Sequence, residues 1–357
     1  MALPPAPLNA SRDGAAMEDG ASKPVRPVTS YDVALLAGVT QPTVSRAMRG
    51  DRIAESTRLR VLAAAETLEY VPSDAGRSLA TRRTNRVGIV LSQLTNHFYV
   101  DVLSAFERSL AAAGYQVIIF RQPEDDDALL AQLSSGGIDG VALTSLRLGS
   151  SVPAELQKRN IPTVLLNRET DSLASDVCVS DNVAGSRLVA QRLVELGHTR
   201  IGAIFGPADT STGRDRAIGF RDSLAESGIA IHPDAAREVA YTHLAGHDSF
   251  IDIMRSKHPP TAVFCSNDVL AIGAMNGAMK QGIRVPDEVT LIGYDDMTMS
   301  SWEVFDLTTV RQNLELMTTT AAELLLGHIK GLHSDPQRIV IQPCLVLRST
   351  DGPPRSG

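Results

Sequence analysis

Apolar and polar positions follow two different periods along this chain. Between residues 30 and 68, apolar residues recur at helical spacing in three short runs separated by turn residues. From Val87 onward, short continuous apolar runs alternate with longer amphipathic segments of helical period. The pattern therefore predicts a small all-helical head followed by a larger body of alternating strands and helices.

The first two helical runs meet at Gly38, within the sequence VTSYDVALLAGVTQPTVSRAMRGDR at residues 28–52. Glycine permits the left-handed backbone of a tight turn, and Ala34 is small at the position where the two helices approach. Val44 faces the same contact from the second helix. Thr40 is placed to cap that helix, and Pro42 falls in its first turn, where a missing N–H costs nothing. This spacing predicts a helix-turn-helix.

A third helical pattern at residues 55–68 completes the predicted head, and Pro72 ends it. Its predicted inward face, with the residues packed beneath it, consists of Leu59, Leu62, Ala63, Glu66, Leu68, Tyr70 and Val71. Residues 73–80 form a weak, short helical pattern followed by the basic sequence TRRTNR. Composition predicts a linker here, in which Leu79 is an apolar residue poorly placed for any core.

The body shows short apolar strand patterns separated by helical ones. The strand patterns lie at residues 87–91, 116–120, 140–143, 163–166, 176–179, 201–205, 262–265, 289–293 and 338–347. Helical patterns at 98–113, 183–196, 214–227 and 268–280 each end near a glycine, which is a helix-terminating signal. Continuous apolar strands between helices predict parallel sheets covered on both faces, here in two α/β lobes. In such sheets ligands bind beyond the carboxyl ends of the strands.

The net charge of −7 is divided unevenly along the chain. Residues 23–86 carry eleven Lys and Arg against six Asp and Glu, whereas the part from residue 87 onward has a net charge of −10. A basic head on an acidic body predicts DNA binding by the head alone, because the body repels the phosphate backbone.

Composition excludes several other classes of protein. A chain of 357 residues with 43% hydrophobic and 21% charged residues is typical of a soluble protein of two or three domains. No apolar run approaches the roughly eighteen residues of a membrane span, and the N-terminal segment lacks the basic and apolar regions of a signal peptide. We therefore expect a cytoplasmic, nucleoid-associated protein, translated from Met1 or from Met17. Because the histidines form no ligand pair and Cys178, Cys265 and Cys344 lie far apart, we expect buried thiols, no metal site and no cofactor.

Several longer motifs occur in a fixed order. They are VTSYDVALLAGV and TVSRAMRG in the head, RSLATRRTNRVGIVL across the linker, and NHFY, VSDNVAGSRLVAQRLVELGHTRIGAI, RDRAIGF, SNDVLAIGAM, GIRVPDEVTLIGYDD and LTTVRQN in the body. From Val28 to about Thr350 the chain resembles the lac repressor / galactose repressor (LacI/GalR) family of bacterial transcription regulators. The resemblance implies a helix-turn-helix head, a hinge helix, and a two-lobed core of Rossmann-like lobes similar to periplasmic binding proteins. It also implies homodimerisation through the core.

Pattern and resemblance together predict a domain organisation. We expect a disordered extension at 1–26, a helix-turn-helix domain at 27–72, a hinge helix and linker at 73–85, an effector-binding and dimerisation core at 86–350, and a tail at 351–357. Within the core, the predicted N-lobe covers about 86–179 and 312–338, and the predicted C-lobe covers about 180–311 and 339–350.

The resemblance also implies which head residues contact DNA. Gln41, Pro42 and Arg46 match the positions that read operator bases; Gln and Arg pair bidentately with base edges, while Pro42 offers only an apolar contact. Contacts to the DNA backbone set the register of the protein on the duplex. For these we expect Thr29, Tyr31, Thr40, Thr43, Ser45 and Arg49.

In the linker, Leu79 matches the family's hinge leucine, which enters the minor groove at the operator centre and kinks the duplex. Arg77 lies beside it in the basic linker. Gly76 stands where the family usually has alanine, and glycine costs roughly 1 kcal/mol in a helix. We therefore expect a hinge helix that forms only on DNA.

By the same resemblance, residues at the carboxyl ends of the body strands line an effector site between the lobes. They are Asn96, His97, Phe98, Asn167, Arg168, Arg216, Tyr241, Asn267, Asp268, Asp295 and Leu314. Tyr99 and Trp302 are further candidates for stacking on a sugar. Asn167 stands where the family more often has Asp, which leaves the two arginines less compensated and favours a sugar acid or small carboxylate over a neutral sugar.

Three functions are compatible with the α/β body alone: a ligand-controlled transcription factor, an enzyme and a solute-binding protein. The chain contains no phosphate-binding loop, nucleophile elbow or dinucleotide fingerprint, which argues against an enzyme. The basic head argues against a solute-binding protein. We expect a repressor that binds double-stranded, near-palindromic operator DNA as a homodimer, away from membranes, with an effector that either releases the DNA or is required for binding it.

Overall fold

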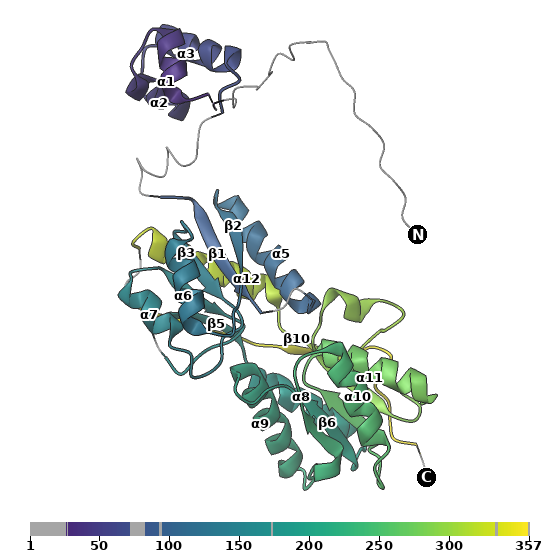
Figure 1. The fold of residues 1–357 in the computed structure, drawn as a ribbon. Helices are drawn as coiled ribbons and strands as arrows, with labels where there is room; N and C mark the ends of the chain where they lie inside the picture. The colour runs from purple at the N-terminus through teal and green to yellow at the C-terminus, as the bar shows by residue number, and fades with distance from the viewer. Residues whose placement is uncertain are drawn as a thin grey trace, which may run out of the picture. The chain divides into compact units, whose positions relative to one another are not determined.

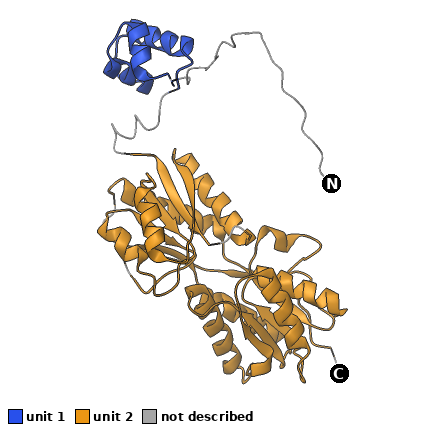
Figure 2. Ribbon diagram, viewed as in Figure 1, with its two compact units in different colours: residues 1–82 blue, residues 83–357 orange. Residues whose placement is uncertain are grey.

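The computed structural model describes residues 26, 28–71, 83–92, 95–172, 174–332 and 335–355. The chain forms two compact units, residues 1–82 and 83–357 (Figure 2). The predicted extension at 1–26 lies outside the described residues except for Arg26, and the predicted hinge helix lies outside them almost entirely. Among the described residues, no helix combines the length and apolar character that crossing a membrane requires.

Three short helices build the head: α1 (Ser30–Ala37), α2 (Gln41–Arg49) and α3 (Glu55–Thr67). α1 ends at Gly38, whose φ of +64° is the left-handed conformation that glycine adopts without strain. Among the described residues, the buried core of the head consists of Val and Ala side chains: Val33, Ala34, Ala37, Val44, Ala47, Val61, Ala64 and Ala65. Small side chains allow the helices to pack closely, and the predicted helix-turn-helix is confirmed.

The predicted inward face of the third helix was wrong in part, although Leu68 and Tyr70 do pack against the head core. α3 buries Val61, Ala64 and Ala65 and leaves Leu59 and Leu62 58% and 39% exposed. The buried positions form an i, i+3, i+4 stripe of small side chains, which fits the narrow space against the other two helices. The stripe that contains the leucines is bulkier and carries Glu66, so it faces outward.

The predicted cap of α2 was also wrong in its chemistry. Thr40 occupies the N-cap position with an extended backbone, but its side chain makes no capping hydrogen bond. The Thr40 hydroxyl instead lies 3.0 Å from the Thr43 hydroxyl.

The N-lobe is a sheet of six parallel strands in the order β11-β5-β4-β3-β1-β2, with helices on both faces (Figure 1). α5 and α12 pack on one face and α6 and α7 on the other. Its strands are β1 (Arg86–Leu91), β2 (Gln116–Arg121), β3 (Gly140–Leu143), β4 (Thr163–Leu166), β5 (Asp176–Ser180) and β11 (Arg338–Ile341). Its helices are α5 (His97–Ala112), α6 (Asp126–Ser135), α7 (Val152–Lys158) and α12 (Leu314–Ile329).

The C-lobe repeats this plan in the order β12-β10-β9-β8-β6-β7, with only the edge strand β12 antiparallel. α8 and α9 cover one face and α10 and α11 the other. Its strands are β6 (Ile201–Phe205), β7 (Ala236–Glu238), β8 (Ala262–Cys265), β9 (Thr290–Asp295), β10 (Thr309–Arg311) and β12 (Cys344–Val346). Its helices are α8 (Asn182–Glu195), α9 (Ser211–Glu226), α10 (His243–Met254) and α11 (Asp268–Gln281), with short 3-10 turns at Pro233–Ala235 and Thr298–Ser301.

The chain crosses between the lobes after β5, after β10 and after β11. The apolar run at 338–347, predicted as one strand, is therefore two strands in two different sheets. β11 pairs with β5 and β12 pairs with β10, with Gln342 and Pro343 between them. The third crossing thus follows Ile341, a few residues later than the predicted lobe boundary at 338/339.

Two smaller predictions for the core also differ from the structure. Asp351, the first residue of the predicted tail, is bonded to the core, because its carboxylate accepts hydrogen bonds from Arg192 Nε at 2.8 Å and from the Thr308 hydroxyl at 2.6 Å. Cys178 and Cys265 are buried, as predicted, but Cys344 is exposed because it lies on the edge strand β12.

Close packing in the head makes Ala34 sensitive to added volume. We predict that Ala34→Leu lowers the free energy of unfolding of the head by about 1–3 kcal/mol, because the helices have no space for a larger side chain. Ala34 is 6% exposed, whereas the adjacent Leu35 is 85% exposed. Leu35→Ala is therefore the matched control and should change stability by less than about 0.5 kcal/mol. Hydrogen exchange of the head amides in the full-length protein measures both, and equal protection in Ala34→Leu and the native protein would contradict the packing described here.

Candidate DNA-binding surface and effector site

The outward face of α2 presents the side chains predicted to read DNA bases. Pro42 and Arg46 are exposed, and Gln41 is partly exposed, with its amide 3.2 Å from the Ser30 hydroxyl. Val44 and Ala47 on the opposite face hold the helix against the head core. Because the buried face fixes the helix, the exposed side chains keep a defined orientation that can enter a major groove.

The two arginines of α2, Arg46 and Arg49, differ in whether they form an ion pair within the protein. Arg49 Nε forms an ion pair with Asp51 at 3.2 Å, so part of its charge is already compensated. Arg46 makes no ion pair within the described residues, and its guanidinium is available to an external acceptor.

The predicted backbone contacts surround α2. Tyr31, Thr40 and Arg49 are exposed, while Thr29, Thr43 and Ser45 are partly exposed. Thr29 also begins α1, because its backbone N–H and its hydroxyl both donate to the carboxylate of Asp32, at 2.8 and 2.6 Å. These hydrogen bonds lower the pKa of Asp32. Leu79, Arg77 and Gly76 lie outside the described residues.

A second group of candidate residues comes together between the two lobes of the core. They surround a small cavity at the carboxyl ends of the strands, where such folds place ligands. The N-lobe contributes Asn96, Phe98 and Tyr99 after β1, and Asn167 and Arg168 after β4. The C-lobe contributes Thr212 and Arg216 from α9, Tyr241 after β7, Asn267 after β8 and Asp295 at the end of β9. We call this the inter-lobe cavity.

Three residues predicted for the effector site lie elsewhere. His97 is exposed at the first position of α5, and Leu314 packs on the N-lobe core. Asp268 is fully buried and binds Met297 N–H, the Ser300 hydroxyl and the Thr309 hydroxyl. Trp302 is also outside the cavity; it is 51% exposed and stacks on Phe305. These residues follow strand ends in sequence, but helix geometry and loop hydrogen bonds point them away from the cavity.

One lining residue, Thr212, was not predicted. It lies in the first turn of α9, two residues after the N-cap residue Thr210. Its segment follows β6, and the rule that ligands gather at the carboxyl ends of strands could have selected it.

Arg216 organises the C-lobe wall of the inter-lobe cavity. It is 2% exposed, and its guanidinium donates to the Asn182 side chain at 2.8 Å and to the Ser266 carbonyl at 2.7 Å. It also forms an ion pair with Asp295 at 3.0 Å and lies 3.7 Å from the centre of the Tyr294 ring. A buried guanidinium is stable only with such partners, so Arg216 connects the ends of β8 and β9 to the start of α8.

Asp295 is a buried carboxylate in this wall, and Asp268 is a second one behind it. Burial raises the pKa of Asp295 to about 6, against the opposing effect of Arg216. Burial, and then the charge of Asp295, raise the pKa of Asp268 to about 7. Gln312, from the second crossing between the lobes, donates to Asp295 at 2.6 Å. Ionising these two carboxylates therefore lowers the stability of the folded protein, and this cost grows as the pH rises.

Several buried polar atoms at the cavity have no hydrogen-bond partner among the described residues. They are Oδ1 of Asn167, Nε of Arg168 and the hydroxyl of Tyr241. Asn167 and Asp295 also have positive φ angles, of 72° and 122°, which are uncommon outside glycine. Unpaired buried polar atoms are typical of a binding site because a ligand can form the missing hydrogen bonds. Strained backbone conformations also cluster at binding sites, where they serve function.

The cavity is almost closed in this conformation. Its volume is about 20 Å³, enough for roughly one water molecule. The lobes are held together by hydrogen bonds from the backbone N–H and hydroxyl of Thr298 to Asp101, at 3.0 and 3.1 Å, and by an ion pair between Arg147 and Asp209 at 3.3 Å. A ligand larger than water therefore requires the lobes or the lining side chains to move apart. Among the described residues, no cluster of His, Cys, Asp or Glu is arranged to hold a metal ion.

Each of the two units of the chain matches a family of known proteins. Residues 29–73 match the family model for bacterial regulatory proteins of the lacI family, and residues 190–350 match that for a periplasmic binding protein-like domain. The HTH-type transcriptional repressor PurR of Yersinia enterocolitica is 34% identical over 333 residues, covering 91% of this chain and 98% of that protein.

Solved structures give the same result. The lac repressor dimer bound to operator and the anti-inducer ONPF is similar with a TM-score of 0.80 and 27% identity, covering 91% of this chain and 99% of that one. The transcriptional regulator CelR in complex with cellobiose is similar with a TM-score of 0.70 and 30% identity, covering 91% and 100%. These relatives are transcriptional regulators, which favours that function over the enzyme and the solute-binding protein considered from the sequence.

The raised pKa of Asp268 predicts a pH-dependent effect of its replacement. The native state binds a proton on Asp268 that the unfolded state, with a pKa near 3.8, has released, so this contribution to stability is lost as pH rises toward about 7. Asp268→Asn cannot ionise, and we predict that its stability relative to the native protein improves between pH 5 and pH 8. The upper limit of this change is roughly 3 kcal/mol, because about two of the three pKa units of the shift lie above pH 5.

Urea unfolding of both proteins at the two pH values measures this change. Asp222→Asn, at an exposed site on α9, is the control and should show no such trend. A difference in stability between Asp268→Asn and the native protein that is the same at pH 5 and pH 8 would contradict the assignment.

Proposed function

The chain belongs to the LacI family of bacterial regulatory proteins, which are DNA-binding transcriptional repressors, and we propose that it binds a near-palindromic operator as a homodimer under the control of a small molecule in the inter-lobe cavity. The observation that carries the proposal is the pairing, in one chain, of an exposed recognition helix with a nearly closed cavity that has unpaired polar atoms. The exposed helix can recognise a DNA sequence, and the cavity can bind a small molecule that controls this recognition. Because it acts on chromosomal DNA, we propose a cytoplasmic location at the nucleoid.

On the DNA side, we propose that α2 enters the major groove. Arg46 would bind a guanine edge, Gln41 an adenine edge, and Pro42 would make an apolar contact. Thr29, Tyr31, Thr40, Thr43, Ser45 and Arg49 would bind phosphates and fix the register. The head carries the positive charge of the chain, so electrostatic attraction draws this unit alone to DNA. We further propose that Leu79 and Arg77 act in the minor groove.

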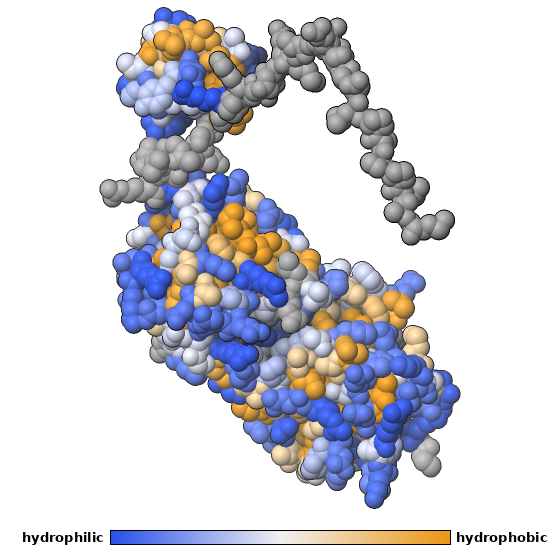
Figure 3. Space-filling model, viewed as in Figure 1, coloured by the Kyte–Doolittle hydropathy of each residue, from blue (hydrophilic) through white to orange (hydrophobic). Residues whose placement is uncertain are grey.

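A homodimer would place two heads on successive half-sites of an operator. The relative solved with operator is a dimer, and two-fold symmetry matches a near-palindromic site. Apolar patches interrupt the hydrophilic surface of the core on both lobes (Figure 3). Apolar side chains more than 45% exposed in the described core include Leu244, Met279, Trp302, Val304 and Leu316. Burying such side chains is the expected driving force for association through the core.

For the effector, we propose a sugar, sugar acid or small carboxylate. Asn167, Arg168 and Asp295 offer both donors and acceptors, and Tyr241 and Phe98 offer ring faces. Gly206 allows the Tyr241 ring to lie against the β6 loop, because a Cβ there would collide with it. The related regulator CelR was solved as a complex with cellobiose, which supports a sugar as the effector. The 20 Å³ volume supports a coupling of effector binding to movement of the lobes or of the lining side chains.

The base-reading role of Arg46 is tested by Arg46→Ala. We predict that operator affinity falls by about 1–3 kcal/mol, while affinity for random DNA changes little, because one base contact and few phosphate contacts are lost. The operator is first selected from a random duplex library with the native protein, and affinities are then measured by fluorescence anisotropy. Arg58→Ala removes an exposed arginine from α3 and is the matched control for charge. Equal losses on operator and random DNA in Arg46→Ala would remove Arg46 from the base-reading set.

The cavity is tested through the hydroxyl of Tyr241, which has no protein partner among the described residues. We predict that Tyr241→Phe leaves stability within about 0.5 kcal/mol and weakens effector binding about tenfold, because a hydrogen bond to the effector is lost. Thermal-shift screening of sugars, sugar acids and small carboxylates identifies the effector, since a ligand that binds only the folded state raises its melting temperature.

Tyr294→Phe is the matched control for Tyr241→Phe. It also removes a buried tyrosine hydroxyl, but from the C-lobe core rather than the cavity. An unchanged effector affinity in Tyr241→Phe, with calorimetry as the measure, would take that hydroxyl out of the site.

A further inference from the structure

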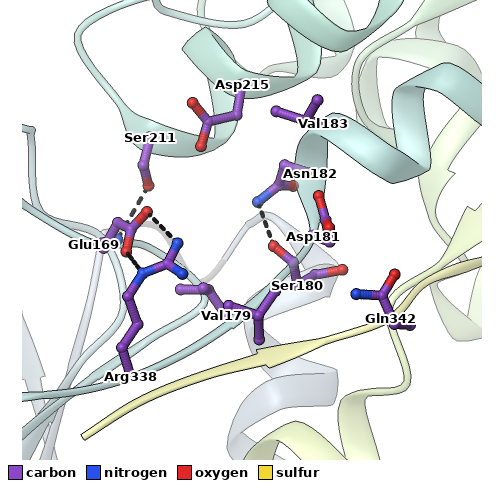
Figure 4. A pocket seen from close by; sticks show the side chains of 11 residues that line it. Glu169, Val179, Ser180, Asp181, Asn182, Val183, Ser211, Asp215, Arg338 and Gln342 are labelled. Atoms are coloured by element: carbon purple, nitrogen blue, oxygen red, sulfur yellow. Dashed lines mark hydrogen bonds and ion pairs between the residues drawn. The ribbon is translucent and has the colours of Figure 1, made fainter.

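A second and larger cavity lies at the junction of the two lobes. Its volume is about 330 Å³, at the lower end of the range for small-molecule sites, and it shares no lining residue with the inter-lobe cavity. Glu169 and Arg338 line it from the N-lobe, while Ser211 and Asp215 line it from α9 of the C-lobe (Figure 4). Asp181, where the chain crosses from β5 to α8, completes the polar part of the wall. We call it the junction cavity.

The wall of the junction cavity carries more negative than positive charge. Its ionisable lining residues are three carboxylates, Glu169, Asp181 and Asp215, and one guanidinium, Arg338. Glu169 compensates Arg338 directly through two hydrogen bonds of 2.7 and 3.0 Å, so this pair contributes no net charge. Asp181 and Asp215 remain, and the lining residues alone have a formal charge of −2, part of which is compensated by the ion pair of Asp215 with Arg214, a residue outside the lining.

The two remaining carboxylates are only partly used by the protein. One oxygen of Asp181 accepts the Ala184 N–H at the start of α8, at 2.9 Å. One oxygen of Asp215 accepts from Arg214 Nε at 2.7 Å, and its side chain is 20% exposed. Within the described residues, the second oxygen of each accepts no further hydrogen bond. Partly buried carboxylates with free acceptor capacity attract a cation more strongly than fully exposed ones.

We propose that the junction cavity is a second ligand site of this protein and that it binds a small organic amine in its protonated form. The ammonium group donates to the free oxygens of Asp181 and Asp215, and the alkyl part lies against Val179 and Val340, which also line the cavity. The ligand class follows from the charge and size of the cavity and differs from the sugar or carboxylate proposed for the inter-lobe cavity.

Ligand binding here affects the arrangement of the lobes, because both lobes form the wall. The backbone N–H of Glu169 donates to the Ser211 hydroxyl at 3.0 Å, which directly joins the two sides. A bound amine is held by Asp181 and Asp215 of the C-lobe and packs against Val179 and Val340 of the N-lobe, so it has different affinities for different lobe arrangements. It therefore changes the population of the DNA-binding arrangement; this second step rests on the proposed function, whereas the binding step does not.

Binding is tested by isothermal titration calorimetry of the full-length protein with butane-1,4-diamine at pH 7. Butane-1,4-diol, which has the same chain length and no charge, is the ligand control. Asp215→Asn removes one carboxylate of the junction cavity. Asp222→Asn removes an exposed carboxylate from the same helix and lies outside the cavity, so it is the protein control. Thermal unfolding without ligand verifies that both variants fold.

We expect saturable binding of the diamine and at least tenfold weaker binding of the diol. Affinity for the diamine should fall at least tenfold in Asp215→Asn and remain unchanged in Asp222→Asn. Absence of saturable binding by the native protein, or equal losses in the two variants, overturns the proposal, since the latter indicates general attraction to an acidic surface. Operator affinity with and without diamine then tests the second step. Normal diamine binding without operator binding would contradict the proposed function and leave the junction site intact.

Discussion

The core depends on the buried guanidinium of Arg216. Stacked on Tyr294 and bonded to Asn182, Ser266 and Asp295, it joins the start of α8 to the ends of β8 and β9. A charge removed from water requires such a complete set of partners, so these elements are fixed relative to one another. One wall of the inter-lobe cavity is therefore rigid. We propose that the motion admitting a ligand occurs between the lobes, which are joined by a few exposed hydrogen bonds, an ion pair and the apolar contacts of Ile272 and Met297 with the N-lobe core.

Much of the fold could be predicted from hydrophobic pattern because its strands are buried on both faces. β3 and β4 have no exposed residue, and such continuous apolar runs are unambiguous. The pattern failed where an element is short or where the chain changes sheets. β7 and β10 have three residues each, too few to show a period, and β11 and β12 formed one apolar run in sequence. In the head, the same method preferred leucines to the smaller side chains of Val61 and Ala64, since hydrophobicity does not report the space between helices.

The residues of the inter-lobe cavity were predicted in part, and the successes and the errors have different causes. Position in the family sequence placed eight of the eleven expected residues on one cavity, including Asn167 and Asp295 with their unusual backbone. It could not distinguish a residue that faces the cavity from one that braces it, as Asp268 does with three hydrogen bonds behind the wall. The near closure of the cavity depends on contacts between distant segments, such as Thr298 with Asp101, and no local sequence pattern encodes these.

We propose that the repressor has two states, and that ligand and operator each favour one arrangement of the lobes. Reciprocity is then required: the factor by which effector changes operator affinity equals the factor by which operator changes effector affinity. The most direct test is calorimetric measurement of effector affinity for the free protein and for the protein saturated with operator, beside operator affinity with and without effector. We predict that effector changes operator affinity, and operator changes effector affinity, by the same factor, which is about fivefold or more. Effector affinity that is unaffected by bound operator would contradict it.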